Sequence, residues 1–302
     1  MIIVQLVGGL GNQLSNYAFA RLLKHNYPLA EIRISNDSCD FTHNGYELEL
    51  AFDINNKIPI CSFREYKEVS KRLPYVNHSF PFKCVRKIYN TFIDGYYSRR
   101  SDDPLIYESF SSHSQILGSI NSIDYSKNYC FHGLWLSYHY PEIIGDLRKE
   151  LKFRVIDTPL NKEHTQKAQE PNSVALHVRR GDYLTLYKEN NILDSDYYDK
   201  AIQRIKTMIR NPCFLVFSDD LDYAEEMVKK HDVQYHIVNG NSGSASYMDM
   251  YLMSLCSNFV IANSSFSYWA ALLGRTDRSV VICPKRYNTN VEMWDVPGFI
   301  KN

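Results

Sequence analysis

Short apolar runs alternate with amphipathic stretches along the second half of the chain. The runs are rich in β-branched and aromatic residues, whereas the stretches between them repeat apolar residues at helical spacing. The predicted strands are 174–178, 214–217, 235–238, 259–262 and 280–283, and the predicted helices are 197–209, 223–230, 245–256 and 266–273. This alternation is typical of a parallel sheet covered by helices on both faces, with 280–283 as its last strand.

The N-terminus follows the same pattern. Residues 1–7 are apolar and predict a buried strand, and the glycine-rich turn 8–13 comes directly after them. Apolar residues at helical spacing then predict a helix to about Lys24, and residues 31–35 predict a second strand. This strand, loop, helix and strand order is typical of nucleotide-associated folds.

The signal is weaker between residues 40 and 150. Short aromatic segments there do not order into a topology, although 129–135 predicts a strand and Pro141 a helix start. Residues 154–172 contain two prolines, mixed charges and little apolar periodicity, which indicates a linker or a domain edge.

We therefore expect an α/β protein with an N-terminal domain over residues 1–155 and a C-terminal, Rossmann-like domain over residues 156–302. The length of 302 residues suits two domains of ordinary size. In parallel sheets ligands bind beyond the carboxyl ends of the strands. We therefore expect ligand-binding residues in the loops after Val178, Phe217, Val238 and Ala262.

Composition and charge exclude several classes. Lys and Arg total 34, as do Asp and Glu, so the zero net charge argues against a nucleic-acid binder. The seven cysteines are scattered and contain no C-x-x-C, so neither a disulfide framework nor a zinc site follows. The apolar N-terminus is too short for a signal peptide, and no apolar run reaches the ~20 residues of a membrane span. We expect a cytoplasmic protein.

The strongest candidate for chemistry is the segment from His177 to Tyr183 at a strand end, which contains adjacent arginines and a glycine turn. Arginine presents a planar fork of donors that matches phosphate oxygens, and a fixed cation stabilises a departing diphosphate. Adjacent strand residues point to opposite faces. One of Arg179 and Arg180 is therefore expected to contact phosphate while the other pins the loop, by pairing with Asp182. The alternative is a structural Arg–Asp pair in a turn.

Two further loops carry polar residues. Asp219 and Asp220 follow the next strand, where a carboxylate accepts hydrogen bonds from ribose hydroxyls or from guanine. Asp220-Leu221-Asp222 is also a D-x-D string, which leaves a metal site open, although Asp222 is better interpreted as a helix cap. Ser264 and Ser265 open a helix, where backbone N–H groups and hydroxyls form an anion site, or simply an N-cap.

The glycine turn is the fourth candidate. Gly9 and Gly11 lack the third glycine of the dinucleotide fingerprint, although Glu31 lies near the spacing of a ribose-binding acid. An NAD(P) oxidoreductase is therefore a formal alternative. Asn12 and Gln13 are better interpreted as side chains aimed into an interdomain cleft.

These motifs occur in the order and at the spacing of a known family. The glycine turn 8–13, the segment 177–183, residues 217–220 and the stretch 253–269, which ends in Ile-Ala-Asn-Ser-Ser-Phe-Ser-Tyr-Trp, resemble the bacterial α-1,2-fucosyltransferases of glycosyltransferase family 11. The resemblance implies a GT-B-like fold, with two Rossmann-like domains facing a cleft. It also implies an inverting transfer of L-fucose from the co-substrate GDP-β-L-fucose to O2 of a terminal galactose, without a cofactor or a metal.

The resemblance also implies roles for single residues. Arg179 matches the arginine on the donor pyrophosphate, and Asn12 a polar group near the transferred sugar; these two form the expected catalytic pair. The other expected donor-binding residues are His177, Arg180, Asp182, Asp219, Asp220, Ser264, Ser265, Phe266, Gly9 and Gly11.

Acceptor recognition is expected in the N-terminal half. Residues 133–140 differ from the usual central motif of the family, so the identity of the acceptor glycan stays open. A galactose-terminated and lipid-linked acceptor would bring the protein to the inner face of the plasma membrane as a peripheral contact. The remaining alternatives are a transferase for another GDP-sugar and a non-catalytic sugar-binding relative.

Overall fold

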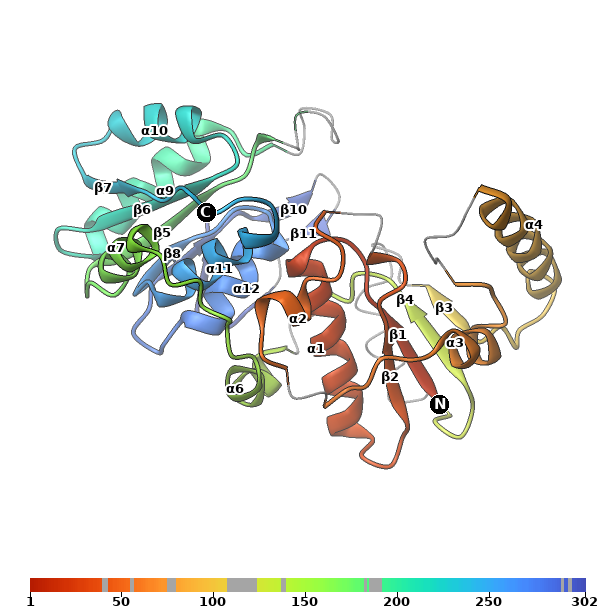
Figure 1. Cartoon of the computed structure of the whole chain (residues 1–302). Helices are drawn as coiled ribbons and strands as arrows, with labels where there is room; N and C mark the ends of the chain where they lie inside the picture. Colours follow the sequence, from red (N-terminus) through yellow and green to blue (C-terminus); the bar gives the residue numbers. More distant parts are fainter. Residues whose placement is uncertain are drawn as a thin grey trace. The chain divides into compact units, whose positions relative to one another are not determined.

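Two units, each built on a parallel sheet, make up the chain (Figure 1). They comprise Met1–Lys152 and Phe153–Asn302. The computed structural model describes residues 1–39, 43–54, 57–74, 80–107, 124–136, 140–181, 184, 192–288, 291–292 and 295–302. Within them, no helix is long and apolar enough to cross a membrane.

The first unit contains a four-stranded sheet in the order β2-β1-β4-β3, and every neighbouring pair is parallel. Its elements are β1 (Ile2–Gln5), α1 (Leu10–Asn26), β2 (Ile32–Ser35), α2 (Leu48–Ala51), α3 (Phe63–Ser70), α4 (Phe80–Tyr97), β3 (Leu105–Tyr107), β4 (Tyr129–His132) and α6 (Tyr140–Glu150).

The first sheet is covered on both faces. On one face, Phe131 of β4 packs edge-on against Phe19 of α1, with the ring centroids 5.3 Å apart. On the other face, Ile3 and Cys130, which are register neighbours, belong to a buried cluster with Tyr66 and Val69 of α3. Burial on both faces explains why β1 is continuously apolar up to Gln5 instead of alternating.

The second unit contains a six-stranded parallel sheet in the order β12-β9-β8-β5-β6-β7. Its elements are α7 (Pro159–Ala168), β5 (Ser173–Val178), α9 (Ser195–Met208), β6 (Cys213–Ser218), α10 (Leu221–Lys229), β7 (Gln234–Ile237), the 3-10 turn η3 (Gly243–Ala245), α11 (Tyr247–Leu255), β8 (Asn258–Val260), α12 (Ser265–Gly274), β9 (Val281–Cys283), β10 (Arg286–Asn288), β11 (Val291–Glu292) and β12 (Phe299–Lys301).

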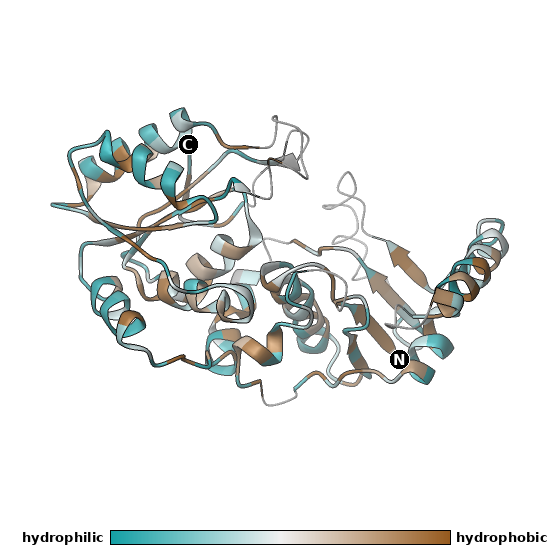
Figure 2. Ribbon diagram, turned by 45° about the horizontal axis from the view of Figure 1, so that its top comes forward, coloured by the Kyte–Doolittle hydropathy of each residue, from teal (hydrophilic) through white to brown (hydrophobic). Residues whose placement is uncertain are grey.

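One core cluster of the second unit lies between its sheet and two amphipathic helices, α9 and α10. Tyr198 and Ile202 of α9 and Met227 of α10 bury their side chains against β5 and β6. Figure 2 colours these strands brown and the outer helices mostly teal, as expected when only one stripe of each helix faces the sheet. Asp194 caps the start of α9 by accepting a hydrogen bond from the Tyr197 amide at 3.0 Å.

The α/β class with parallel sheets is confirmed, but two elements differ from the sequence expectation. Residues 154–172 are not simply a linker, because they contain α7. Pro159 occupies the first turn of that helix and Thr158 caps it, so the proline starts the helix instead of breaking it. Residues 280–283 are not the last strand either, since β12 pairs with β9 at the sheet edge.

Candidate functional site

The loops that carry the polar motifs follow adjacent strands. β5 lies in the middle of the second sheet, with β6 on one side and β8 on the other. The chain continues from β5 to β6 and β7, then returns to β8, so the strand order reverses at β5. Ligands of open parallel sheets bind in the crevice at such a reversal, beyond the carboxyl ends of the strands. Arg179, Asp219 and Ser264 all lie in loops at these ends.

Two arginine–aspartate pairs join the loops after β5 and β6. Arg179 Nη1 lies 3.1 Å from Asp219 Oδ2, and Arg180 Nη1 lies 2.6 Å from Asp220 Oδ2. The Arg180 guanidinium also lies over the Tyr223 ring, 4.4 Å from its centroid. Each of the four charged side chains stays roughly a quarter exposed. The cluster is therefore pre-ordered but open to a ligand.

Asp219 holds the turn that follows β5. Its Oδ1 accepts a hydrogen bond from the Arg180 amide at 2.9 Å. Burial acts to raise the pKa of Asp219, but Arg179 and the amides of Gly181 and Arg180 outweigh it and hold this pKa below its ordinary value. A side chain at Gly181 would lie 3.2 Å from the Asp219 backbone oxygen, so glycine permits this close approach.

The expected pairing of the second arginine with Asp182 stays a prediction. Arg180 pairs with Asp220, whereas Asp182 and Tyr183 lie outside the described residues. Both arginines are paired with an acid, Arg179 with Asp219 and Arg180 with Asp220, and Arg180 also lies over the Tyr223 ring. Which of the two contacts phosphate stays a prediction.

The helix cap after β6 is Asp220 and not Asp222. Asp220 Oδ1 accepts a hydrogen bond from the Tyr223 amide at 3.3 Å, and Asp222 lies in the first turn of α10. The cap is two residues earlier than expected because α10 begins at Leu221. In the described part of the chain, no group of three or more His, Cys, Asp and Glu side chains has a metal-binding arrangement. The carboxylate of Asp220 is already engaged by Arg180 and by the helix start.

The serine turn after β8 meets the end of β5. Ser264 is the N-cap of α12 and accepts a hydrogen bond from the Phe266 amide at 3.3 Å, and Ser265 is the first helical residue. The Phe266 ring lies 6.1 Å from the His177 ring. Burial, with the nearby Arg179 cation, lowers the pKa of His177 to about 3, so this imidazole is neutral at physiological pH.

One acid at this edge was missed by the sequence reasoning. Asp249 lies in the first turn of α11, which follows the loop after β7. Its Oδ1 accepts a hydrogen bond from Asn241 Nδ2 at 2.9 Å, and burial raises its pKa from 3.8 to about 7. A strongly shifted carboxyl group at a ligand-binding edge is a functional candidate. The available signal was a lone charge in the otherwise apolar helix 247–255.

The glycine turn lies in the first unit. Gly8 has φ +70°, a conformation that favours glycine, and a side chain at Gly9 would crowd the His43 ring at 3.1 Å. Gly9 is the N-cap of α1, with Gly11 and Asn12 in the first turn. These three candidate residues therefore belong to a different unit from Arg179 and its neighbours.

Gln13 does not point into a cleft, because it is fully buried and holds the turn together. Its Nε2 donates to the backbone oxygens of Gly8 and Gly45, each at 2.8 Å, and its Oε1 accepts from the Glu47 amide. The Glu47 carboxylate in turn accepts from the Leu10 amide at 2.9 Å. An internal carboxylate thus takes the position at the start of α1 where a dinucleotide phosphate would bind, which argues against the oxidoreductase alternative.

A polar pocket of about 420 Å³ opens at the carboxyl ends of three strands of the first sheet. Gln5, His132 and Tyr107 are the last residues of β1, β4 and β3 and are neighbours in register. The chain order reverses between β1 and β4, as it does at β5. Gln5 is buried, and its Nε2 has no hydrogen-bond partner among the described residues. This pocket was not predicted, because single polar residues at strand ends gave no motif.

Comparison with known proteins identifies relatives over nearly the whole length. A family model described as glycosyl transferase family 11 matches residues 1–295. An O-antigen biosynthesis glycosyltransferase WbnK of Escherichia coli is 27% identical, with 93% of each chain covered. An alpha-1,2-colitosyltransferase of Escherichia coli is 28% identical, with 94% of this chain and 91% of the relative covered.

Solved structures show the same fold. The NodZ alpha-1,6-fucosyltransferase co-crystallized with GDP superposes with a TM-score of 0.54 at 16% identity, covering 90% of this chain and 91% of that chain. NodZ soaked with GDP-fucose gives a TM-score of 0.52 at 17% identity. The fold class is therefore the α/β, GT-B-like class of these enzymes.

Proposed function

Because the chain belongs to glycosyl transferase family 11, we propose that it transfers L-fucose from GDP-β-L-fucose to O2 of a terminal galactose in an α-1,2 linkage. The observation that carries this proposal is the pair of arginines at the end of β5, ordered by the acids after β6. A cation held at a strand reversal fits a diphosphate leaving group, and a purely sugar-binding protein has no use for one.

Arg179 is the proposed contact to the donor pyrophosphate. As the bond between fucose and GDP breaks, negative charge grows on the leaving oxygen, and a fixed guanidinium stabilises that charge more in the transition state than in the ground state. Asp219 keeps the guanidinium in position at 3.1 Å. Arg180 acts through the loop, because Asp220 and Tyr223 hold it in place.

The start of α12 is the proposed second anion contact. Amides at a helix N-terminus and the hydroxyls of Ser264 and Ser265 bind phosphate oxygens without a metal. Phe266 and the neutral His177 border this turn, where an uncharged surface suits the nucleoside. Together these groups hold GDP through backbone, hydroxyl and guanidinium donors, so we propose a transfer that needs neither a metal nor a cofactor.

We propose that Asp249 accepts hydrogen bonds from the guanine base of GDP. Asp219 and Asp220 are the alternative residues for this role. The Asp249 pKa of about 7 leaves this acid close to the point of ionisation, and the donors of a guanine edge would favour the carboxylate form. A buried acid whose ionisation lowers the stability of the folded protein is more typical of a functional site than of a structural one.

The acceptor is proposed to bind the polar pocket of the first unit. A pocket of about 420 Å³ with an unpartnered amide, a tyrosine and a histidine suits sugar hydroxyls. Burial lowers the pKa of His132, so its imidazole is neutral and able to accept a hydrogen bond from an acceptor hydroxyl. The glycine turn, with Asn12, Gly9 and Gly11, is proposed to contact the transferred sugar. Attack of the acceptor oxygen opposite the departing GDP inverts the β-linked donor to an α-linked product.

The test is direct. Purified protein is incubated with GDP-fucose and a panel of galactose-terminated oligosaccharides in EDTA, and GDP release and product mass are followed. We expect an acceptor-dependent gain of one deoxyhexose, with the linkage to O2 read by NMR. Absence of any GDP-sugar binding in calorimetry would overturn the proposed donor class.

A second donor has a specific observation in its favour, because one relative is named an alpha-1,2-colitosyltransferase. Fucose and colitose differ by one hydroxyl group. A competition between GDP-fucose and GDP-colitose, scored as the ratio of kcat/KM, decides between the two donors.

The acceptor pocket has a test of its own. We expect Tyr107→Ala to raise KM for the acceptor about tenfold, as loss of one sugar contact does, and to leave KM for the donor unchanged. A change in the donor KM alone would contradict the assignment.

We further propose that the enzyme works in the cytoplasm, where sugar nucleotides are available.

A further inference from the structure

Helix α4 carries large apolar side chains on the protein surface. Val85, Ile88, Phe92 and Tyr96 are 56%, 69%, 81% and 53% exposed, and Phe80 at its first turn is 79% exposed. The spacing of three, four and four residues aligns the first four on one stripe of the helix. None of the 18 residues of α4 is buried. A stripe of this kind on an exposed helix marks an interaction surface.

The other side of α4 is polar and faces the protein. Arg86, Asn90 and Asp94 line the polar pocket. Asp94 Oδ1 accepts a hydrogen bond from the nearly buried Arg72 at 2.8 Å, and the Asn90 side chain is bonded to both backbone groups of Leu73. Figure 2 shows hydrophobic and hydrophilic residues alternating along this helix. The helix is therefore fixed through its polar face, and its apolar stripe points outward.

The region around α4 is basic although the protein is neutral. Residues 62–103 contain nine Lys and Arg but only five Asp and Glu, which gives +4 in a chain whose net charge is zero. Lys67 and Lys71 of this region line the same groove as Tyr96 of the apolar stripe, whereas Lys87 lines the polar pocket. The surface therefore combines an apolar stripe with positive charge, which complements an anionic partner that is apolar beneath its charged layer.

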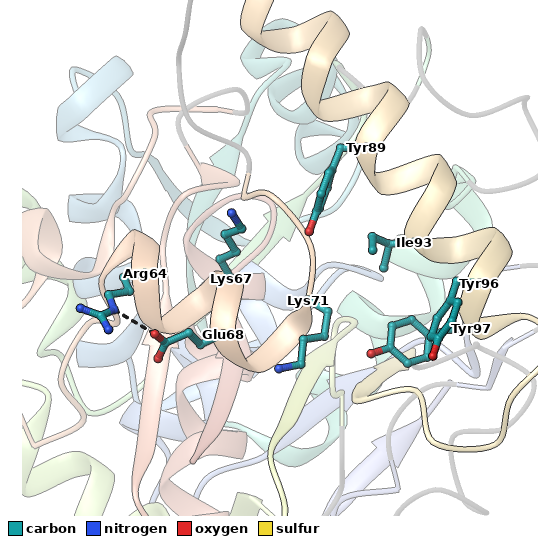
Figure 3. Close-up of a pocket in the computed structure, with 8 residues that line it drawn as sticks. All are labelled: Arg64, Lys67, Glu68, Lys71, Tyr89, Ile93, Tyr96 and Tyr97. Carbon is teal, nitrogen blue, oxygen red and sulfur yellow. Dashed lines mark hydrogen bonds and ion pairs between the residues drawn. The ribbon is translucent and has the colours of Figure 1, made fainter.

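An open groove of about 580 Å³ lies between α3 and α4 (Figure 3). Lys67 and Lys71 extend from the α3 side, and Tyr89, Ile93, Tyr96 and Tyr97 from α4. Lys67 Nζ lies 5.9 Å from the centre of the Tyr89 ring. Glu68, the one acid among the described residues that line the groove, is bound to Arg64 at 2.8 Å. Tyr96 belongs to both the groove and the apolar stripe, so the two features are continuous.

We propose that α3 and α4 form a membrane-docking surface for an anionic phospholipid bilayer. The apolar stripe enters the boundary between head groups and acyl chains, as the apolar faces of interfacial helices do. Lys67 and Lys71 bind head-group phosphates in the groove, and the tyrosines lie at the level where aromatic residues gather in membranes. The inference does not depend on which sugar is transferred, because it concerns a surface outside the donor site.

The experiment is vesicle co-sedimentation of the full-length protein with phosphatidylcholine vesicles, with and without phosphatidylglycerol. We expect binding to the anionic vesicles, loss of binding at high salt, and little binding to phosphatidylcholine alone. Ile88→Glu combined with Phe92→Glu should weaken binding about 100-fold, or tenfold for each apolar side chain. Lys67→Gln combined with Lys71→Gln should weaken it about 25-fold, or fivefold for each lysine.

Leu29→Glu is the matched control, because Leu29 is fully exposed in the same unit but lies outside α3 and α4. It should bind vesicles like the wild type. All variants should keep wild-type circular dichroism and turnover of a soluble acceptor. Failure of the wild type to bind anionic vesicles would overturn the proposal. A loss of vesicle binding in Leu29→Glu as large as that in the α4 variant would overturn it as well. A wild-type dimer that Phe92→Glu splits without any effect on vesicle binding would instead identify a contact between copies.

Discussion

Replacing Asp249 by asparagine should make the protein more stable above neutral pH. The side chain keeps its shape, and the hydrogen bond from Asn241 Nδ2 at 2.9 Å remains available to the new amide oxygen. What disappears is the cost of holding a charge inside the protein. Burial raises the pKa of Asp249 from 3.8 to about 7, which at about 1.36 kcal/mol per pH unit corresponds to about 4 kcal/mol.

The sign of the pH dependence follows from the two ionisation states. Below pH 3.8 the carboxyl group is protonated in both the folded and the unfolded chain, so it contributes nothing. Between pH 3.8 and about 7 the unfolded chain loses the proton while the folded protein keeps it, so the free energy of unfolding falls as pH rises. Above pH 7 both states are ionised and the whole cost is present.

The assay is urea unfolding of the wild type and Asp249→Asn at several pH values from 4 to 8. The difference in free energy of unfolding should be near zero at pH 4 and should grow toward about 4 kcal/mol in favour of the variant at pH 8. Comparing the two proteins at each pH removes the contributions of the other titrating groups. A difference that stays constant with pH, or a variant less stable than the wild type at pH 8, would refute the reasoning. If Asp249 reads the base, the stabilised variant also binds GDP more weakly in calorimetry.

Three further predictions concern the donor site and the packing. Arg179→Ala should lower kcat about 10²–10³-fold while the circular dichroism spectrum stays unchanged, because one preorganised contact to the leaving group is lost; near-normal turnover would rule out the proposed role. EDTA should leave turnover largely intact, whereas a strict Mn²⁺ requirement would restore the D-x-D interpretation of Asp220 and Asp222. Gly274→Ala should destabilise the protein by about 1–3 kcal/mol, since its new carbon would lie 2.1 Å from the Ser254 carbonyl oxygen. Gly95→Ala is the control, because the new carbon would meet no atom within 4 Å beyond its chain neighbours and the nearby backbone of its own helix. Thermal unfolding should show this variant slightly stabilised.

The fold of the second unit was predictable because its elements are strongly patterned. β5 and β6 are six residues long and mostly apolar, and amphipathic helices separate the strands. The first unit was harder, since β3 is only three residues long and pairs with β4, which follows it in the chain by more than 20 residues. Proline signals were ambiguous, as Pro159 shows by starting a helix where a linker or a domain edge was expected; the two units do divide just before this segment, at Phe153.

The candidate donor residues came from the sequence because they form a contiguous motif directly after a strand. His177, Arg179 and Arg180 are close neighbours in the chain, and a strand end is where parallel sheets bind ligands. Asp249 and Gln5 carry no such motif. Asp249 stands out because burial beside Asn241 raises its pKa, and Gln5 because its buried amide nitrogen has no hydrogen-bond partner among the described residues. Both are properties of the packed structure.

The sequence by itself determined the alternation of strands and helices, the order of the ligand-binding loops and the family resemblance, because periodicity and local motifs are written along the chain. Only the tertiary structure decided which acid pairs with which arginine and that three strand ends form a polar pocket. It decided as well that Gln13 is buried and holds the glycine turn by hydrogen bonds. It also decided that the apolar stripe of α4 faces outward, since a helical pattern shows that one face is apolar but not what that face meets. Such pairings join residues distant in the chain, and packing energy selects them from many combinations that the sequence allows.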